Sequence, residues 1–151
     1  MTQKVSVSET VVISRPPDEV WDFTQDFDKR RQWDPSILEA KAEPAVFPPR
    51  VRVRAAGGLS AIFQYKQFDR PERTSLAMED IHSPWIESGG GTWLYEPEGS
   101  GTRWTQTNTL MVKPRWLSAL LQPVVERRLR STTRTAMQRA KAMLESDRRA
   151  G

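Results

Sequence analysis

The sequence contains no cysteine and a single histidine, His82. Without cysteine the chain can form no disulfide, no thiolate nucleophile and no cysteine-ligated metal centre. With one histidine, a zinc site would need carboxylates for most of its ligands, which is an uncommon donor set for zinc. We therefore expect neither a bound metal nor another cofactor.

Long hydrophobic runs are also missing. No apolar stretch approaches the roughly 18 residues that a membrane-spanning helix needs, and residues 1–14 lack the charged-then-apolar pattern of a signal peptide. The cytoplasm is the expected location. A chain of 151 residues can fill one core, so we expect a single domain over residues 1–151.

Positive charge is unevenly distributed along the chain. The net charge is +4, yet the segment from Lys113 onward holds ten Lys or Arg against three Asp or Glu. Such a basic segment is usually a solvated helix face, and no sequence motif of a nucleic-acid-binding fold accompanies it. We expect no nucleic-acid partner, whereas contact with an anionic membrane surface and the oligomeric state stay open.

A helical pattern dominates the last third of the chain, residues 114–146. Apolar or small side chains recur there every three or four residues, and basic side chains lie between them. A stripe this wide must be covered by another part of the fold. Its members are Trp116, Leu117, Leu120, Leu121, Val124, Val125, Leu129, Thr132, Thr133, Ala136, Met137, Ala140, Met143 and Leu144.

Upstream of this helix, alternation with period two predicts strands that supply the cover. Two prolines followed by Asp18 and Glu19 predict the start of a short helix within residues 14–21, because both residue types suit the first turn. Residues 26–33 predict a second short helix with residues 28–31 exposed. The predicted strands are residues 4–14, 37–45, 51–54, 59–68, 73–82, 92–96 and 102–112.

Three segments carry a family resemblance: residues 13–21, the tripeptide Trp33-Asp34-Pro35, and the hairpin of residues 95–105. Together with the terminal helix they resemble the START-like (SRPBCC) superfamily of polyketide cyclases and dehydrases, lipid-transfer domains and coenzyme Q-binding proteins. The resemblance implies an α+β helix-grip fold, in which a curved antiparallel sheet wraps around the long C-terminal helix and two short helices follow the first strand. It also implies a cavity for an apolar or aromatic molecule. Chemistry in the superfamily ranges from none to ring cyclisation, so the fold does not fix the function.

Strand parity and the inner stripe of the helix select the residues that would line this cavity. Ligand pockets are mostly apolar with a few polar groups. For any single residue, core filling is the favoured explanation, because aromatic side chains dominate cores; as a set, the residues are expected to leave a void. The predicted lining is Phe63, Tyr65, Met78, Trp93, Tyr95, Trp104, Gln106, Asn108, Leu121, Val125 and Leu129.

Gln106 and Asn108 are polar exceptions on an apolar strand face. A buried amide without a partner costs about 1–3 kcal/mol, so both need hydrogen bonds. A ligand carbonyl or hydroxyl, the terminal helix or solvent at an open sheet end would each serve, and the sequence does not choose among them.

His82 is the candidate acid–base residue, because histidine exchanges protons readily near neutral pH. It shares strand parity with Leu76 and Met78, so it faces the cavity unless a bulge intervenes, and Asp80 is the expected companion. A solvated histidine at a strand end is the favoured alternative.

These observations favour a binding or transport protein for a small apolar or aromatic molecule, such as a lipid, a quinone or a polyketide-like compound. The alternative is a polyketide cyclase or dehydrase that uses His82 as its acid or base. The lack of a convincing acid–base cluster favours the first hypothesis, and whether a reaction is catalysed stays open.

Overall fold

The computed structural model describes residues 4–150, with side chains as far as residue 146, and over this range the chain forms seven strands and three helices. The elements are β1 (Lys4–Ile13), α1 (Pro17–Thr24), α2 (Arg30–Trp33), β2 (Ile37–Ala42), β3 (Arg50–Ala55), β4 (Leu59–Asp69), β5 (Arg73–His82), β6 (Ile86–Glu98), β7 (Gly101–Val112) and α3 (Arg115–Ala150).

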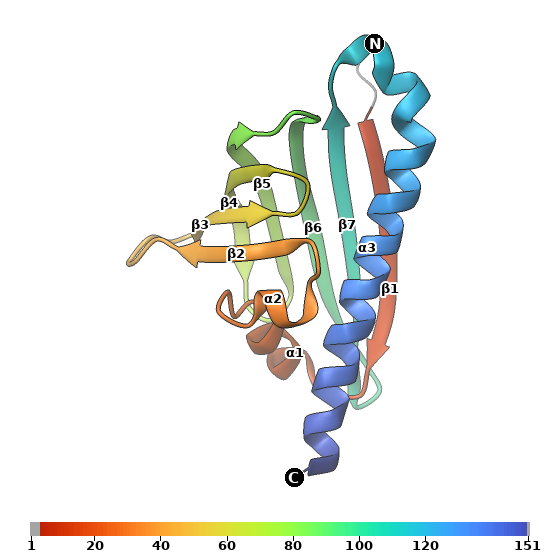
Figure 1. Ribbon diagram of the computed structural model, residues 1–151. Helices are drawn as coiled ribbons and strands as arrows, with labels where there is room; N and C mark the ends of the chain where they lie inside the picture. Colours follow the sequence, from red (N-terminus) through yellow and green to blue (C-terminus); the bar gives the residue numbers. More distant parts are fainter. Residues whose placement is uncertain (1–3, 151) are drawn as a thin grey trace.

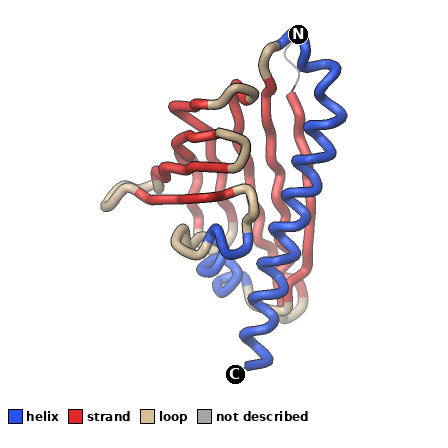
Figure 2. Tube along the Cα trace, in the orientation of Figure 1, coloured by secondary structure: helices blue, strands red, loops and turns tan. Residues whose placement is uncertain are grey.

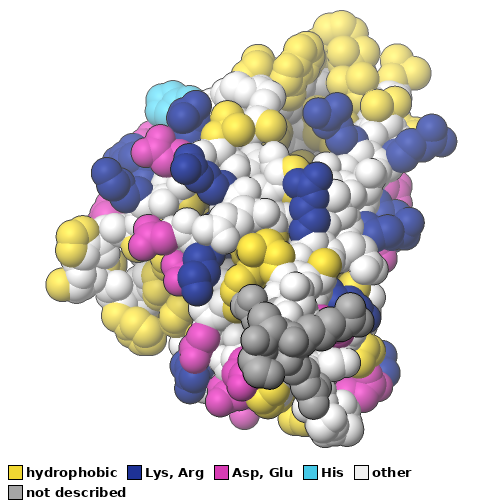
Figure 3. Space-filling model, turned by 60° about the horizontal axis from the view of Figure 1, so that its bottom comes forward, with side chains coloured by type: hydrophobic (Ala, Val, Ile, Leu, Met, Phe, Trp, Pro, Cys, Tyr) yellow, Lys and Arg dark blue, Asp and Glu magenta, His cyan; other side chains and the backbone are white. Residues whose placement is uncertain are grey.

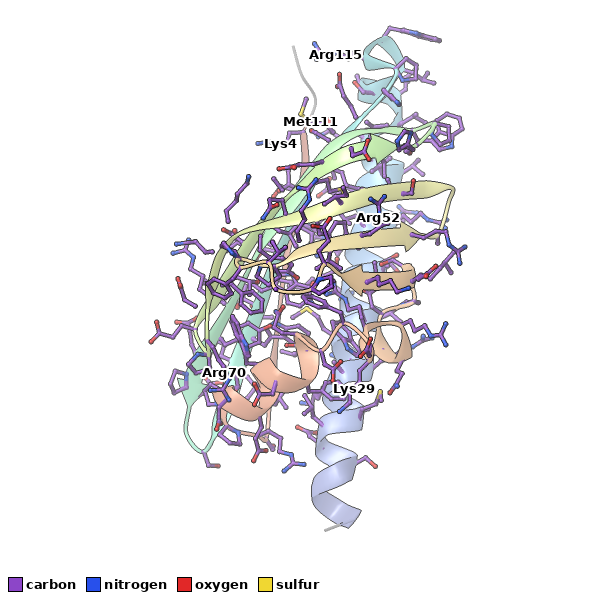
Figure 4. The ribbon with its side chains drawn as sticks, turned by 90° about the vertical axis from the view of Figure 1, so that its left-hand side faces the viewer. Lys4, Lys29, Arg52, Arg70, Met111 and Arg115 are labelled. Atoms are coloured by element: carbon purple, nitrogen blue, oxygen red, sulfur yellow. The ribbon has the colours of Figure 1, made fainter. Side chains whose placement is uncertain are left out.

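The strands form one antiparallel sheet in the order β1-β7-β6-β5-β4-β3-β2. After β1 the chain passes through α1 and α2 to the opposite edge of the sheet, and the other strands return as a meander until β7 pairs with β1. Figures 1 and 2 show α3 running along β1 and β7, and Figure 4 shows the sheet curving around this helix. The predicted helix-grip fold is confirmed.

In β1, the alternation of apolar and polar residues in the sequence corresponds to an alternation of buried and exposed side chains. Val5, Val7, Val11 and Ile13 are buried, and Glu9 on the same face is partly buried and pairs with Arg134 of α3, whereas the residues of the other parity face outward. Since successive strand residues point to opposite faces, these four apolar side chains turn toward α3.

The connection after β1 follows the sequence signals for α1 and departs from them for α2. Pro17 lies in the first turn of α1, with Asp18 and Glu19 beside it, as predicted. The second helix is shorter than predicted, because residues 26–29 form a turn in which Asp26 Oδ1 accepts a hydrogen bond from the Asp28 backbone N–H at 3.0 Å.

The two halves of α3 differ in burial. Ala136, Met137, Ala140 and Leu144, in the second half, are buried against the sheet and α1–α2. In the first half, the residues on the same face are only partly buried apart from Ser118, and the outward face carries exposed apolar side chains. The helix is continuous through Pro123.

Strand β6 is longer than the predicted residues 92–96, because it continues through three glycines. A Cβ atom on Gly89 would lie 2.8 Å from Met78 Sδ, and one on Gly91 would lie 2.8 Å from Asn108 Oδ1. The missing side chains therefore make room for residues of β5 and β7 that turn toward the interior.

Candidate functional site

The inner face of the sheet carries a row of large side chains from β6 and β7. Tyr95 is paired with Trp104, and Trp93 with Gln106, across the two strands. Alternate strand residues share a face, so these four side chains lie together beneath α3 and α2. All four are at most 6% exposed.

Trp33 of α2 completes a cluster of three indole rings with Trp93 and Trp104. The ring centroids are 5.4–6.0 Å apart. Nε1 of Trp33, Nε1 of Trp104 and Nε2 of Gln106 are fully buried and have no hydrogen-bond partner among the described residues. Each unpaired buried donor costs about 1–3 kcal/mol. The cluster thus holds three N–H groups without an acceptor among the described residues.

Arg30 places a buried positive charge beside these rings. Its guanidinium carbon lies 4.5 Å from the Trp93 ring centroid and 4.9 Å from that of Trp33, and the residue is 7% exposed. Arg30 Nε donates to Asp34 Oδ2 at 3.0 Å, which balances the charge. The hydroxyl of the buried Tyr65 is a further polar neighbour of the Arg30 side chain and interacts with it by a hydrogen bond.

A chain of hydroxyl and amide groups holds the two interior tyrosines. Tyr65 donates to Gln25 Oε1 at 3.4 Å, and Gln25 Nε2 donates to the Tyr95 hydroxyl at 2.8 Å. The Thr24 hydroxyl donates to the Val20 carbonyl at 2.8 Å, so it accepts the Tyr95 proton at 2.8 Å. Burial raises the pKa of both tyrosines. The nearby Arg30 partly opposes this rise in the pKa of Tyr65. Both phenols therefore stay protonated at neutral pH.

Asn108 links the sheet to α3. Its Nδ2 donates to Thr133 Oγ1 at 3.1 Å and to Gln106 Oε1 at 3.0 Å, and its Oδ1 accepts from Trp93 Nε1 at 3.4 Å. The terminal helix therefore supplies the partner of Asn108, whereas one donor of Gln106 is left over.

The remaining predicted lining residues surround this buried floor. Phe63, Tyr65 and Met78 belong to a second cluster built on β3–β5. Leu121, Val125 and Leu129 stand at four-residue spacing in line with the buried Thr133, so they share the inner face of α3. Met78 and these three helix residues are partly exposed, in contrast to the buried floor residues of β6 and β7. All eleven predicted residues face the interior, and their contact with a ligand stays a prediction.

His82 and Asp80 do not face this interior. Ser60 pairs with His82, but Ile62 pairs with Glu79, so β5 holds an extra residue and Asp80 has a positive φ of 48°. This bulge reverses the parity on which the expected orientation rested. The His82 and Asp80 side chains are 74% and 57% exposed and lie 3.3 Å apart. With residues of β2–β4 they line a pocket of about 240 Å³ on the outer side of the sheet.

Two further classes of site find no support in the described residues. There, no group of three or more metal-ligating side chains comes together, and no helix is both long and apolar enough to cross a membrane.

The comparisons with known proteins agree with this geometry. The model of the polyketide cyclase/dehydrase and lipid transport family matches residues 4–145. The chain belongs to this family. Among curated proteins, none matches the sequence significantly.

Solved structures with the family's fold cover nearly the whole chain. An aromatase/cyclase, Zhui from Streptomyces sp. R1128, is 15% identical, has a TM-score of 0.76 and covers 95% of this chain and 94% of its own. A START superfamily protein from Mycobacterium smegmatis is 15% identical, with a TM-score of 0.77 and coverage of 93% and 97%. A protein from Thermus thermophilus is 17% identical, with a TM-score of 0.79 and coverage of 96% and 99%. The START-like resemblance is confirmed.

Sequence reasoning missed the polar part of this family member's interior. It placed Arg30 on an exposed face, yet the residue is buried, because α2 is a single turn that points Arg30 inward between two indoles. The four-residue spacing of Arg30 and Asp34, next to Trp33, was the available signal. Thr24 and Gln25 gave no such signal, since their role depends on the distant Tyr95.

Proposed function

We propose that the chain binds a small, mostly apolar ring compound that carries oxygen acceptors, such as a quinone or a polyketide-like aromatic ketone, between the inner sheet face and α3. One observation carries the proposal: three buried N–H donors without partners lie in one indole cluster beside the Arg30 guanidinium. Indole walls suit an aromatic body, and unpaired donors suit its oxygens.

The energy of these hydrogen bonds predicts that the site prefers ring compounds with oxygen acceptors to equally apolar rings without them. A hydrogen bond to a charged group contributes about 1.5–3 kcal/mol, which corresponds to roughly 10–100-fold in affinity. Rings without oxygen would gain the apolar contacts but leave the donors of Trp33, Trp104 and Gln106 unpaired. A ligand whose oxygen accepts a hydrogen bond from the charged Arg30 guanidinium should therefore bind at least about tenfold tighter than its hydrocarbon analogue, and pairing a neutral donor adds to this preference.

The test is a titration with 2-methyl-1,4-naphthoquinone and, as matched control ligand, 2-methylnaphthalene, monitored by tryptophan fluorescence. We expect the quinone to bind more tightly by at least about tenfold. Arg30→Gln should remove most of this preference, whereas Arg31→Gln, at the exposed neighbouring position, should keep it. Equal affinities of the two ligands for the unchanged protein would refute the proposal. Mass spectrometry of the purified protein for a co-purifying apolar compound provides an independent test.

A cyclase or dehydrase activity is the second candidate. Its specific support is the likeness to an aromatase/cyclase structure together with the polar cluster of Arg30, Asp34 and Tyr65 in the interior. The exposed His82 has no contact with that cluster among the described residues, so an acid–base role for the pair His82 and Asp80 stays a prediction without geometric support. Conversion of a linear aromatic polyketide mimic that is lost in Arg30→Gln and kept in His82→Ala would establish an activity centred on the interior.

A further inference from the structure

The outward face of the first half of α3 carries an exposed apolar row. Trp116, Leu120 and Val124 are 80%, 75% and 64% exposed. They are spaced four residues apart, which places them along one side of the helix, away from the sheet. Exposed apolar side chains scattered singly are ordinary, whereas a contiguous row of large ones marks a contact surface.

A second element extends this row at the same end of the molecule. The loop before β6 lies against the start of α3, because the Lys113 backbone N–H donates to the Trp85 carbonyl at 2.8 Å. Trp85 is itself 55% exposed. Figure 3 shows hydrophobic side chains gathered at the end where α3 begins, and Figure 4 places Arg115 at that end. We call Trp85, Trp116, Leu120 and Val124 the apolar tip.

Basic residues border the apolar tip. Arg127 and Arg128 follow Val124 by one helical turn, and both are exposed. No ion pair of either residue is found among the described side chains, whereas Arg115 is paired with Glu87 at 3.1 Å. Lys113, which is hydrogen-bonded to Trp85 through its backbone and precedes Trp116 in the chain, adds a further positive charge. The border is thus net positive.

We propose that the apolar tip docks on an anionic lipid surface. Tryptophan favours the membrane–water interface, and basic residues beside it gain from negatively charged headgroups. A second copy of the chain fits less well, because a two-fold contact through this face would bring the same uncompensated cations of Arg127, Arg128 and Lys113 together. The positive charge at the border of the apolar tip therefore favours binding to an anionic lipid surface and disfavours self-association through this face.

The experiment measures co-sedimentation of the protein with phosphatidylcholine vesicles that either contain or lack phosphatidylglycerol, at low and high salt. We expect binding to the anionic vesicles that weakens as salt rises. Leu120→Gln/Val124→Gln should weaken it by about tenfold or more, since both apolar contacts are lost. Arg127→Gln/Arg128→Gln should weaken it by about fivefold per residue. The matched controls, Leu38→Gln on β2 and Arg31→Gln on α2, replace exposed residues elsewhere and should bind like the unchanged protein.

Several outcomes would overturn the proposal. No binding at low salt, or equal binding by the tip variants and the controls, would remove lipid as the partner. A dimer in solution that Leu120→Gln/Val124→Gln dissociates would assign the apolar tip to a second copy. Leu120, Val124, Arg127, Arg128 and the two control positions are all exposed, so the melting temperatures of these variants should match and a folding defect is recognised directly. Gln106→Leu, which alters the interior alone, should leave vesicle binding unchanged.

Discussion

Replacing Gln106 with leucine should stabilise the free protein and weaken ligand binding at the same time. In the folded chain Gln106 Nε2 is buried and unpaired, a penalty of about 1–3 kcal/mol that leucine removes. The substitution also deletes the bond that Asn108 Nδ2 donates to Gln106 Oε1, worth about 0.5–1.5 kcal/mol. Asn108 Nδ2 keeps its bond to Thr133, and its other N–H loses an acceptor on a side chain that is only partly buried. The free energy of unfolding should therefore rise by about 1 kcal/mol.

Urea denaturation measures this gain as a higher midpoint with an unchanged slope. The affinity for 2-methyl-1,4-naphthoquinone should fall about tenfold, because one donor to its oxygens is lost. Gln67→Leu, which changes an exposed glutamine of β4, is the matched control and should alter neither quantity. A Gln106→Leu protein that is less stable than the unchanged one would mean that Nε2 has a partner in solution, and the reasoning would fail.

Three further predictions concern stability. Tyr95→Phe should cost about 1–3 kcal/mol, because Gln25 Nε2 loses its buried acceptor. Burial raises the pKa of the Tyr95 phenol above its ordinary value near 10, so the protonated phenol contributes fully to folding stability below pH 10, and this contribution is lost as the pH rises toward the folded pKa. In an alkaline titration followed by circular dichroism, Tyr95→Phe should therefore lose less folding stability than the unchanged protein does. Gly91→Ala should lower the melting temperature through the 2.8 Å clash of its Cβ with Asn108 Oδ1, whereas Gly99→Ala meets no atom within 4 Å and is strained only by its φ of 60°. The hydrogen bond from Arg70 lowers the pKa of Asp22, so this pair stabilises the fold above the ordinary Asp pKa of 3.8, and the stabilisation is lost as the pH falls through the folded pKa. The difference in folding stability between Asp22→Asn and the unchanged protein should be small, shrink with salt and vanish in acid.

Periodic features could be predicted from the sequence because they depend on local spacing. The burial of alternate residues in β1, the proline start of α1 and the buried stripe in the second half of α3 follow from periods of 2 and 3.6 residues. In the first half of α3 the prediction was wrong for Trp116, Leu120 and Val124, which were counted in the covered stripe and are exposed. Strand alternation also predicted that Trp93, Tyr95, Trp104 and Gln106 share one face of the sheet. Their cross-strand pairing, Trp93 with Gln106 and Tyr95 with Trp104, is consistent with this prediction.

Features that depend on one irregular residue or on distant contacts could not be predicted in this way. A single bulge at Asp80 turns His82 to the outer face, and nothing in the local pattern announces it. Arg30 has the charge of a surface residue, and it is buried only because Asp34, Trp33 and Trp93 meet around it. The chemical character of the interior therefore required the three-dimensional arrangement.

Nuclear magnetic resonance of the indole N–H groups can show whether the buried Trp33 and Trp104 donors bind the oxygens of a ligand. The six tryptophans give separate signals that single Trp→Phe variants assign. On addition of 2-methyl-1,4-naphthoquinone, we expect the Trp33 and Trp104 signals to move, because their unpaired donors gain an acceptor, while the signals of the exposed Trp85 and Trp116 stay in place. Unchanged Trp33 and Trp104 signals at a quinone concentration that saturates the fluorescence change would contradict it.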